Sequence, residues 1–195
     1  MKRTVWTMAL LAASLVVLVS CAGPYLQSRS DIFKGRQLLA NEEYAEARQE
    51  FVKAAEAQPS TWAYAFIATA SYKMNDLAQA QAAIDDALKM DGRSDAYMRV
   101  LAYKGLILLK EGRREEGIEA LRYCLNAYRD YYPIPHRGEI ERLLNAGASD
   151  LPRLERLLDQ AIKSYESDIA EWLSTGTGYM AERYGKPLGR EVPYP

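Results

Sequence analysis

The feature that most restricts the fold of this 195-residue chain is a pair of small residues that recurs at a constant separation. The two members are 12 residues apart in three successive copies, which are Gly35 and Ala47, Ala68 and Ala80, and Gly105 and Gly117. Successive copies begin 33 and 37 residues apart. Repetition at this period is typical of chains built from stacked supersecondary units, and small residues let neighbouring helices approach closely. The pattern therefore predicts helical hairpins, each with one close contact between its two helices.

Larger residues and turn signals follow the same period. Phe51, Ile84 and Leu121 lie at equivalent positions and are expected to fill the space between the helices. Pro59 ends the first unit because proline cannot continue a helical hydrogen-bond ladder, and Gly92 ends the second. The predicted helices of the three units run over residues 31–40 and 44–57, 62–74 and 77–90, and 96–111 and 114–131.

The three units resemble tetratricopeptide repeats, whose period is about 34 residues. The resemblance covers roughly residues 28–131, and the domain of three repeats is placed at residues 31–131. It implies an all-α, right-handed solenoid of helical hairpins that acts as a binding scaffold. The chain departs from the family pattern at Asp31 and Leu101, where an aromatic residue is usual, and at Lys34 and Lys104, where an apolar residue is frequent.

Residues 132–175 are predicted to form C-terminal capping helices. A short helix is expected near 138–146, followed by a long one that begins after Ser149 or Asp150 and continues to about residue 175. Leucines and aromatic residues recur at helical spacing along the long helix, so one of its faces is apolar. A degenerate fourth repeat or cap is favoured, because the last repeat of a solenoid must cover the open core. A dimerisation or partner-docking helix is the alternative, and residues 176–195 are predicted to be an extended or disordered tail.

The amino terminus has the pattern of a targeting segment. Lys2 and Arg3 precede an apolar run over residues 5–19, which suits a signal peptide better than a membrane span. Leu18-Val19-Ser20-Cys21 resembles a bacterial lipobox. The resemblance implies cleavage after residue 20 and acylation of Cys21, with an ordinary cleaved signal or an uncleaved anchor as alternatives. Residues 21–30 are predicted to be a membrane-proximal linker.

The expected location follows from the same resemblance. Ala22 follows the cysteine where an Asp would retain a lipoprotein in the inner membrane of enteric bacteria, so the periplasmic face of the outer membrane is expected. The outer leaflet of the inner membrane and the cell surface are less favoured. The formal net charge of −1 gives no reason to expect nucleic acid as a partner.

Catalytic and metal chemistry find little support. One His and two Cys are few for a metal site, and no converging acid, base or nucleophile is recognisable, so neither an enzyme nor a cofactor is predicted. Cys124 lies at a small buried position of the repeat and is expected to be a core thiol. An aromatic and proline cluster at residues 123–135 is expected to seal the join between the repeats and the cap.

The resemblance also places a candidate binding groove. In tetratricopeptide repeats the first helix of each pair lines the concave surface, and spacing of three and four places such residues on one helix face. The lining positions here are Arg29, Ile32, Arg36, Leu39 and Ala40; Trp62, Ala65, Thr69, Tyr72 and Lys73; and Arg99, Ala102, Leu106, Leu109 and Lys110. Five are basic and none is acidic. The candidate peptide-binding residues are Arg29, Arg36, Trp62, Thr69, Tyr72, Lys73, Arg99, Leu106 and Lys110.

These residues predict a cationic groove that holds an extended peptide or its carboxylate. The alternative is a solvated face on which Lys73 and Lys110 complement helix C-termini. The expected function is a non-catalytic adaptor that binds a protein or peptide partner of the cell envelope, in the assembly of barrels, pili, secretion machinery or the cell wall. A periplasmic small-ligand or peptide binding and sensing protein is the second expectation.

Overall fold

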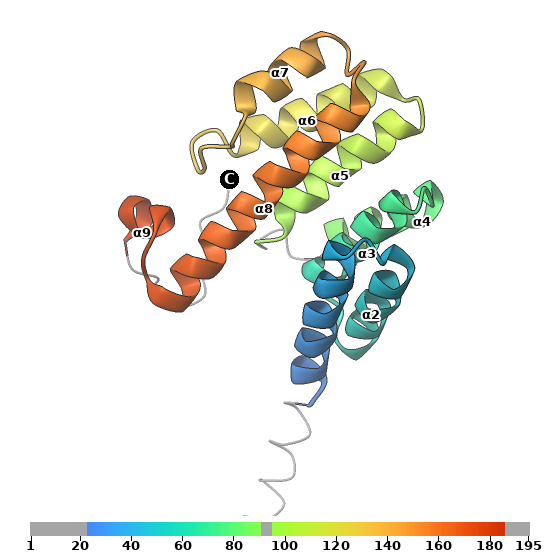
Figure 1. Ribbon diagram of the computed structural model, residues 1–195, viewed down its shortest axis with the longest axis vertical. Helices are drawn as coiled ribbons and strands as arrows, with labels where there is room; N and C mark the ends of the chain where they lie inside the picture. Colours follow the sequence, from blue (N-terminus) through green and yellow to red (C-terminus); the bar gives the residue numbers. More distant parts are fainter. Residues whose placement is uncertain (1–22, 91–94, 186–195) are drawn as a thin grey trace, which may run out of the picture.

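The computed structural model describes residues 23–90 and 95–185, and this part of the chain is helical with no strands (Figure 1). A first helix occupies residues 23–40. The later helices are α2 (Tyr44–Ala57), α3 (Thr61–Lys73), α4 (Leu77–Lys89), α5 (Tyr97–Lys110), α6 (Arg114–Ala127), α7 (Arg137–Asn145), α8 (Leu151–Thr175) and α9 (Tyr179–Tyr184). Helices adjacent in sequence pack in pairs, which confirms the prediction of an all-α helical-hairpin solenoid.

The small residues mark the closest helix contacts. Gly35 faces the ring of Phe51, and a Cβ atom at Gly35 would lie 2.5 Å from Phe51 Cε1. In the third hairpin a Cβ at Gly105 would lie 2.5 Å from Leu121 Cγ, and one at Gly117 would lie 2.9 Å from the Gly105 carbonyl oxygen. These separations are too short for a side chain. The recurring small residue is therefore required by the geometry of the hairpin.

One type of turn ends the first helix of each hairpin. The turn has a residue with positive φ, and the next residue donates its backbone N–H to a carbonyl five positions earlier, which is a Schellman motif. The positive-φ residues are Glu42 (65°), Asn75 (63°), Gly112 (82°) and Gly147 (75°). The corresponding hydrogen bonds are Glu43 to Leu38, Asp76 to Ser71, Arg113 to Leu108 and Ala148 to Leu143, at 2.8–2.9 Å. The fourth copy joins α7 to α8, so these two helices form a degenerate fourth hairpin.

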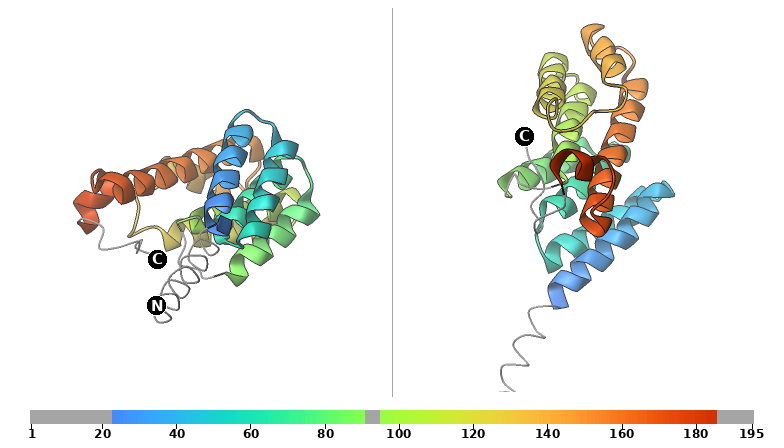
Figure 2. Two further views of the ribbon diagram at one scale, coloured as in Figure 1. Left: turned by 90° about the horizontal axis from the view of Figure 1, so that it is seen from below. Right: turned by 90° about the vertical axis from the view of Figure 1, so that its left-hand side faces the viewer.

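Helix α8 crosses the front of the solenoid and packs against α5 and α7 (Figure 1). Asp150 caps its first turn by accepting the backbone N–H of Arg153 at 3.1 Å, as predicted. Its predicted apolar face is buried along the whole helix and includes Leu154, Leu158, Ala161, Ile162, Tyr165, Ile169 and Trp172. The two further views in Figure 2 show the same crossing, with α7 and α8 covering one side of α5 and α6. Helix α8 therefore belongs to the core.

The aromatic cluster seals this join, as predicted. Tyr128 and Tyr132 are buried, and the ring centroids of both lie within 5.2 Å of the centroid of Tyr165 in α8. Tyr123 remains 61% exposed. Most of the cluster is thus structural, and one member lies at the surface.

Two sequence predictions at the chain ends need correction. Residues 23–30, predicted to belong to a linker, are helical in the structure. The segment from residue 176, predicted to be an extended or disordered tail, contains α9, whose Met180 is buried. The signal peptide at 1–20 and Cys21 lie outside the described residues. Within residues 23–90 and 95–185, none of the helices has the length and apolar character that crossing a bilayer requires.

Candidate functional site

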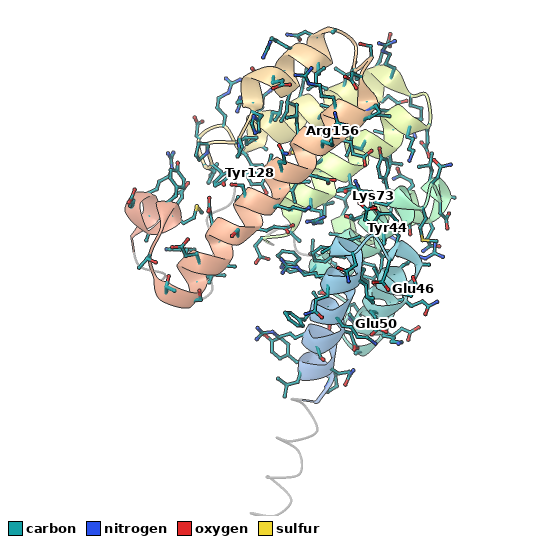
Figure 3. The ribbon with its side chains drawn as sticks, viewed as in Figure 1. Tyr44, Glu46, Glu50, Lys73, Tyr128 and Arg156 are labelled. Atoms are coloured by element: carbon teal, nitrogen blue, oxygen red, sulfur yellow. The ribbon has the colours of Figure 1, made fainter. Side chains whose placement is uncertain are left out.

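The candidate surface is the face formed by the first helix, α3 and α5, here called the concave face. It carries the predicted groove residues, and α8 lies over part of it (Figure 3). The three helices meet through aromatic and cationic side chains. Helix α3 packs against α5, and the Arg36 guanidinium of the first helix lies 5.6 Å from the ring centroid of Phe66 in α3.

Lys73 holds the N-terminal half of α8 on this face. Its ammonium group forms ion pairs with Glu155 and with Asp159, the latter at 2.7 Å. The Tyr72 hydroxyl donates to the second oxygen of Glu155 at 2.9 Å. Burial lowers the pKa of Lys73, but the two carboxylates outweigh that effect and raise it above its ordinary value. Lys73, which is labelled in Figure 3, is therefore a charged contact within the fold that links the end of α3 to α8.

Arg99 and Glu166 form a bidentate pair further along α8. The guanidinium Nε and Nη2 atoms donate to the two carboxylate oxygens at 2.7 and 2.9 Å. The Arg99 side chain is 6% exposed and the Glu166 side chain is 4% exposed. Arg99 also lies 4.5 Å from the ring centroid of Phe66 and donates to the Thr69 hydroxyl oxygen at 3.3 Å. A charged pair so well buried is stable only because both of its partners are present.

Two further contacts complete the join. The Tyr103 hydroxyl donates to Asp159 at 2.7 Å, and burial together with that carboxylate raises the pKa of Tyr103 well above its ordinary value. The Lys110 ammonium lies 4.3 Å from the ring centroid of Tyr72 and bonds to the Tyr72 carbonyl oxygen. The sequence pattern did not predict this contact, because Tyr103 is not one of the repeat positions that line the concave surface.

The acidic residues that face these cations lie on one side of α8. Glu155, Asp159 and Glu166 are separated by four and seven residues, a spacing that places them in one row of a helix. Their row adjoins the buried apolar face. The spacing of these acidic residues can be seen in the sequence. Their role as partners of the cations on α3 and α5 becomes clear only from the position of α8 in the structure. The concave face thus binds an acidic helix within the same chain.

The N-terminal part of the concave face has different surroundings. Arg29 and Arg36 are exposed, and within the described part of the chain neither forms an ion pair. The Arg36 guanidinium lies 5.8 Å from the ring centroid of Trp62, whose indole N–H donates to Asp95. Leu39 of the first helix is half-buried against the core. The structure therefore leaves this end of the predicted groove accessible.

The predicted residues consequently fall into three groups. Lys73, Arg99, Tyr72 and Thr69 take part in the contact with α8 or lie buried under it, and Lys110 stacks on Tyr72. Leu106 is fully buried in the core. Arg29, Arg36 and Trp62 remain on accessible surface.

The described residues include one further group of chemical interest, the thiol of Cys124. It is 2% exposed, and its Sγ atom lies 3.9 Å from the Met98 carbonyl oxygen. Burial raises its pKa to about 12, so the thiol is protonated at neutral pH. Since the thiolate is the reactive form, this cysteine behaves as a core residue.

Comparisons with known proteins add no further assignment. No family model matches the sequence, and no curated protein matches it.

Proposed function

We propose that this chain is a tetratricopeptide-type adaptor, anchored through acylated Cys21 at the periplasmic face of a bacterial outer membrane. It acts without catalysis and binds an acidic segment of another envelope protein. The observation that carries the proposal is the contact of the concave face with α8. Lys73 and Arg99 hold three carboxylates of that helix, so the chemistry of the surface suits an acidic, helical ligand.

The same chemistry continues beyond α8. Arg36 is exposed, lies over the Trp62 and Phe66 rings, and forms no ion pair with a described residue. A guanidinium held over aromatic rings is well placed to bind a carboxylate, because the rings restrict its motion and provide apolar contact area. Aromatic and arginine side chains are also the residues that most often dominate binding energy in interfaces. We therefore assign the partner to this N-terminal end of the concave face.

The geometry guides the choice of variants. Substitution of Lys73 or Arg99 would break the contact with α8 and destabilise the fold. Loss of partner binding in either variant could therefore not be distinguished from loss of folding. Arg36→Glu reverses the exposed charge without touching α8. Arg156→Glu is a matched control, since Arg156 is an exposed arginine on α8 with no ion pair to a described residue (Figure 3).

The test is crosslinking in intact Gram-negative cells that express the full chain with its own signal, followed by mass spectrometry. We expect an envelope protein with an acidic segment to be recovered with the wild type and with Arg156→Glu, and to be lost with Arg36→Glu. Purified Arg36→Glu should retain wild-type helicity by circular dichroism. Equal recovery with both variants would show that the N-terminal end of the concave face does not bind the partner.

A further inference from the structure

The first helix has an unusual distribution of side chains. Its most buried residues are Ser28, Asp31 and Gly35, and its apolar residues Ile32, Leu38 and Leu39 are half-buried against the core. Its outward row contains Leu26 and Phe33, which are 62% and 66% exposed. Leu26 and Phe33 are seven residues apart, two helical turns, so they lie on the same side of the helix. A helix that only had to cover a core would not need large apolar side chains on its outward side.

The charges around this row have one sign. Arg29, Lys34 and Arg36 are exposed on the first helix, and its only acid between residues 23 and 40, Asp31, is turned inward. Asp31 accepts hydrogen bonds from the Gln27 side chain at 2.9 and 3.1 Å. The Lys34 ammonium bonds to Glu50 at 2.9 Å and remains 60% exposed. An apolar row flanked by cations on a helix is the pattern of segments that lie in a membrane interface.

The position of the helix in the molecule agrees with this pattern. The start of the first helix forms the lower extremity of the described residues in Figure 1 and in the right-hand view of Figure 2. In the sequence, Leu26 follows Cys21 by five residues and the apolar run 5–19 by seven. At no more than about 3.5 Å per residue, a chain anchored at Cys21 keeps Leu26 within roughly 18 Å of the bilayer.

We propose that the outward face of the first helix, formed by Leu26 and Phe33 with Arg29 beside them, docks on an anionic phospholipid surface. The two apolar side chains enter the headgroup region, and Arg29 and Lys34 contact lipid phosphates. The docking fixes the direction of the first helix along the membrane and leaves the Arg36 side of the concave face beside the lipid. Its place in the cell rests on the proposed anchoring, whereas its affinity for lipid is a property of the polypeptide alone.

The test uses the mature polypeptide from residue 21 with Cys21→Ser, which retains every buried residue of the described core and has no acyl chain. It is sedimented with vesicles of phosphatidylcholine mixed with phosphatidylglycerol, and with vesicles of phosphatidylcholine alone. We expect binding to the anionic vesicles, weakened roughly tenfold by the double substitution Leu26→Ser and Phe33→Ser, because burial of apolar side chains supplies the affinity. Arg29→Glu should reduce binding to the anionic vesicles and have little effect on binding to neutral ones.

Tyr123→Ser is the matched control, since Tyr123 is 61% exposed on α6, away from the first helix. It should bind vesicles like the wild type. Equal sedimentation of the wild type and the double variant, or no sedimentation of the wild type, overturns the proposal. A dimer that forms without vesicles and is lost in the double variant also overturns it, because the row would then bind a second copy of the chain.

Discussion

The Arg99 guanidinium donates hydrogen bonds to both carboxylate oxygens of Glu166, at 2.7 and 2.9 Å, and thereby joins the third hairpin to α8. Removal of one partner leaves the other charge buried and unpaired. We expect Glu166→Ala to lower the free energy of unfolding by about 3–5 kcal/mol. Replacement of both partners by apolar residues, Arg99→Met with Glu166→Leu, should restore most of that loss. Urea denaturation of the three proteins measures both effects.

An exposed pair at the start of α6 is the control for this prediction. Arg113 and Glu116 form an ion pair at 2.6 Å with side chains that are 48% and 58% exposed. Water screens such a pair, so Glu116→Ala should hardly change the urea midpoint. A similar loss in the free energy of unfolding for Glu116→Ala and Glu166→Ala would show that the contribution of the Arg99–Glu166 pair to stability does not depend on its burial.

The close contact of α5 with α6 gives a second prediction. Gly105→Ala places a Cβ atom 2.5 Å from Leu121 Cγ and 3.1 Å from the Gly117 carbonyl oxygen. The overpacking should cost about 1–3 kcal/mol of stability, although alanine favours helix more than glycine does. Gly138→Ala is the control, because a Cβ at Gly138 in α7 meets nothing within 4 Å. We expect Gly138→Ala to raise the midpoint of thermal unfolding. A higher midpoint for Gly105→Ala as well would contradict the close contact between α5 and α6.

The recurring turn allows a third test. Gly112 and Glu42 occupy the same left-handed position in different hairpins, with φ of 82° and 65°. Only glycine adopts this conformation without steric strain, at a difference of about 1–2 kcal/mol per residue. We expect Gly112→Ala to destabilise the protein by about 1 kcal/mol and Glu42→Gly to leave it as stable or slightly more stable. Thermal unfolding measures both, and destabilisation of similar size by the two changes would contradict the assigned geometry.

Buried acids give a prediction for alkaline pH. Burial raises the pKa of Cys124 to about 12 and raises the pKa values of Tyr72 and Tyr103 above their ordinary value of 10.0. Above pH 9 the unfolded chain therefore binds fewer protons than the folded chain. Stability should decline from pH 9, by up to about 1.4 kcal/mol per pH unit for each group that titrates.

This decline in stability can be measured as the change in the urea midpoint between pH 7 and pH 10.5. In Cys124→Ala the onset should move from pH 9 towards pH 10, because the tyrosines then titrate first. The change in cavity volume lowers stability equally at all pH values and does not affect the onset. An unchanged onset in this variant would mean that the thiol is not the earliest group to titrate.

The proposed anchor has a direct chemical test. Cys21 lies outside the described residues, so its evidence is the lipobox-like sequence alone. Cells grown with an alkyne-labelled fatty acid should label the wild type, and Cys21→Ser should be unlabelled and keep its signal segment. Labelling of the variant would place the modification elsewhere, whereas an unlabelled wild type would remove the anchor from the proposed function.

The repeats could be predicted from the sequence because their determinants are local. Gly35, Gly105 and Gly117 recur at fixed positions, and the turns at Asn75 and Gly112 interrupt the helical pattern where the structure has them. The chain ends were harder. Gly23, Pro24 and Ser28 have the composition of a linker, yet in the structure they belong to the first helix, where Ser28 is buried.

The candidate site could be predicted only in part, for a physical reason. Helical spacing predicts that Arg36, Lys73 and Arg99 share one face of the solenoid. In the structure Arg36 and Arg99 both lie over the Phe66 ring, and Lys73 and Arg99 both form ion pairs with α8. The docking of α8 across that face depends on tertiary packing, since its apolar row could equally have covered the end of the stack. In the structure, Glu155 accepts a hydrogen bond from Tyr72 and Glu166 accepts one from Arg99, and these partners lie 83 and 67 residues away in sequence.

The crossing of α8 gives the array two unlike ends. At the C-terminal end α8 lies against α5, so another hairpin could be added there only if the helix moved away. At the N-terminal end the first helix has its Leu26 and Phe33 row uncovered within the described structure. Lengthening of the array at its C-terminal end, whether by gene duplication during evolution or by a designed insertion, would therefore require α8 to be displaced from α5.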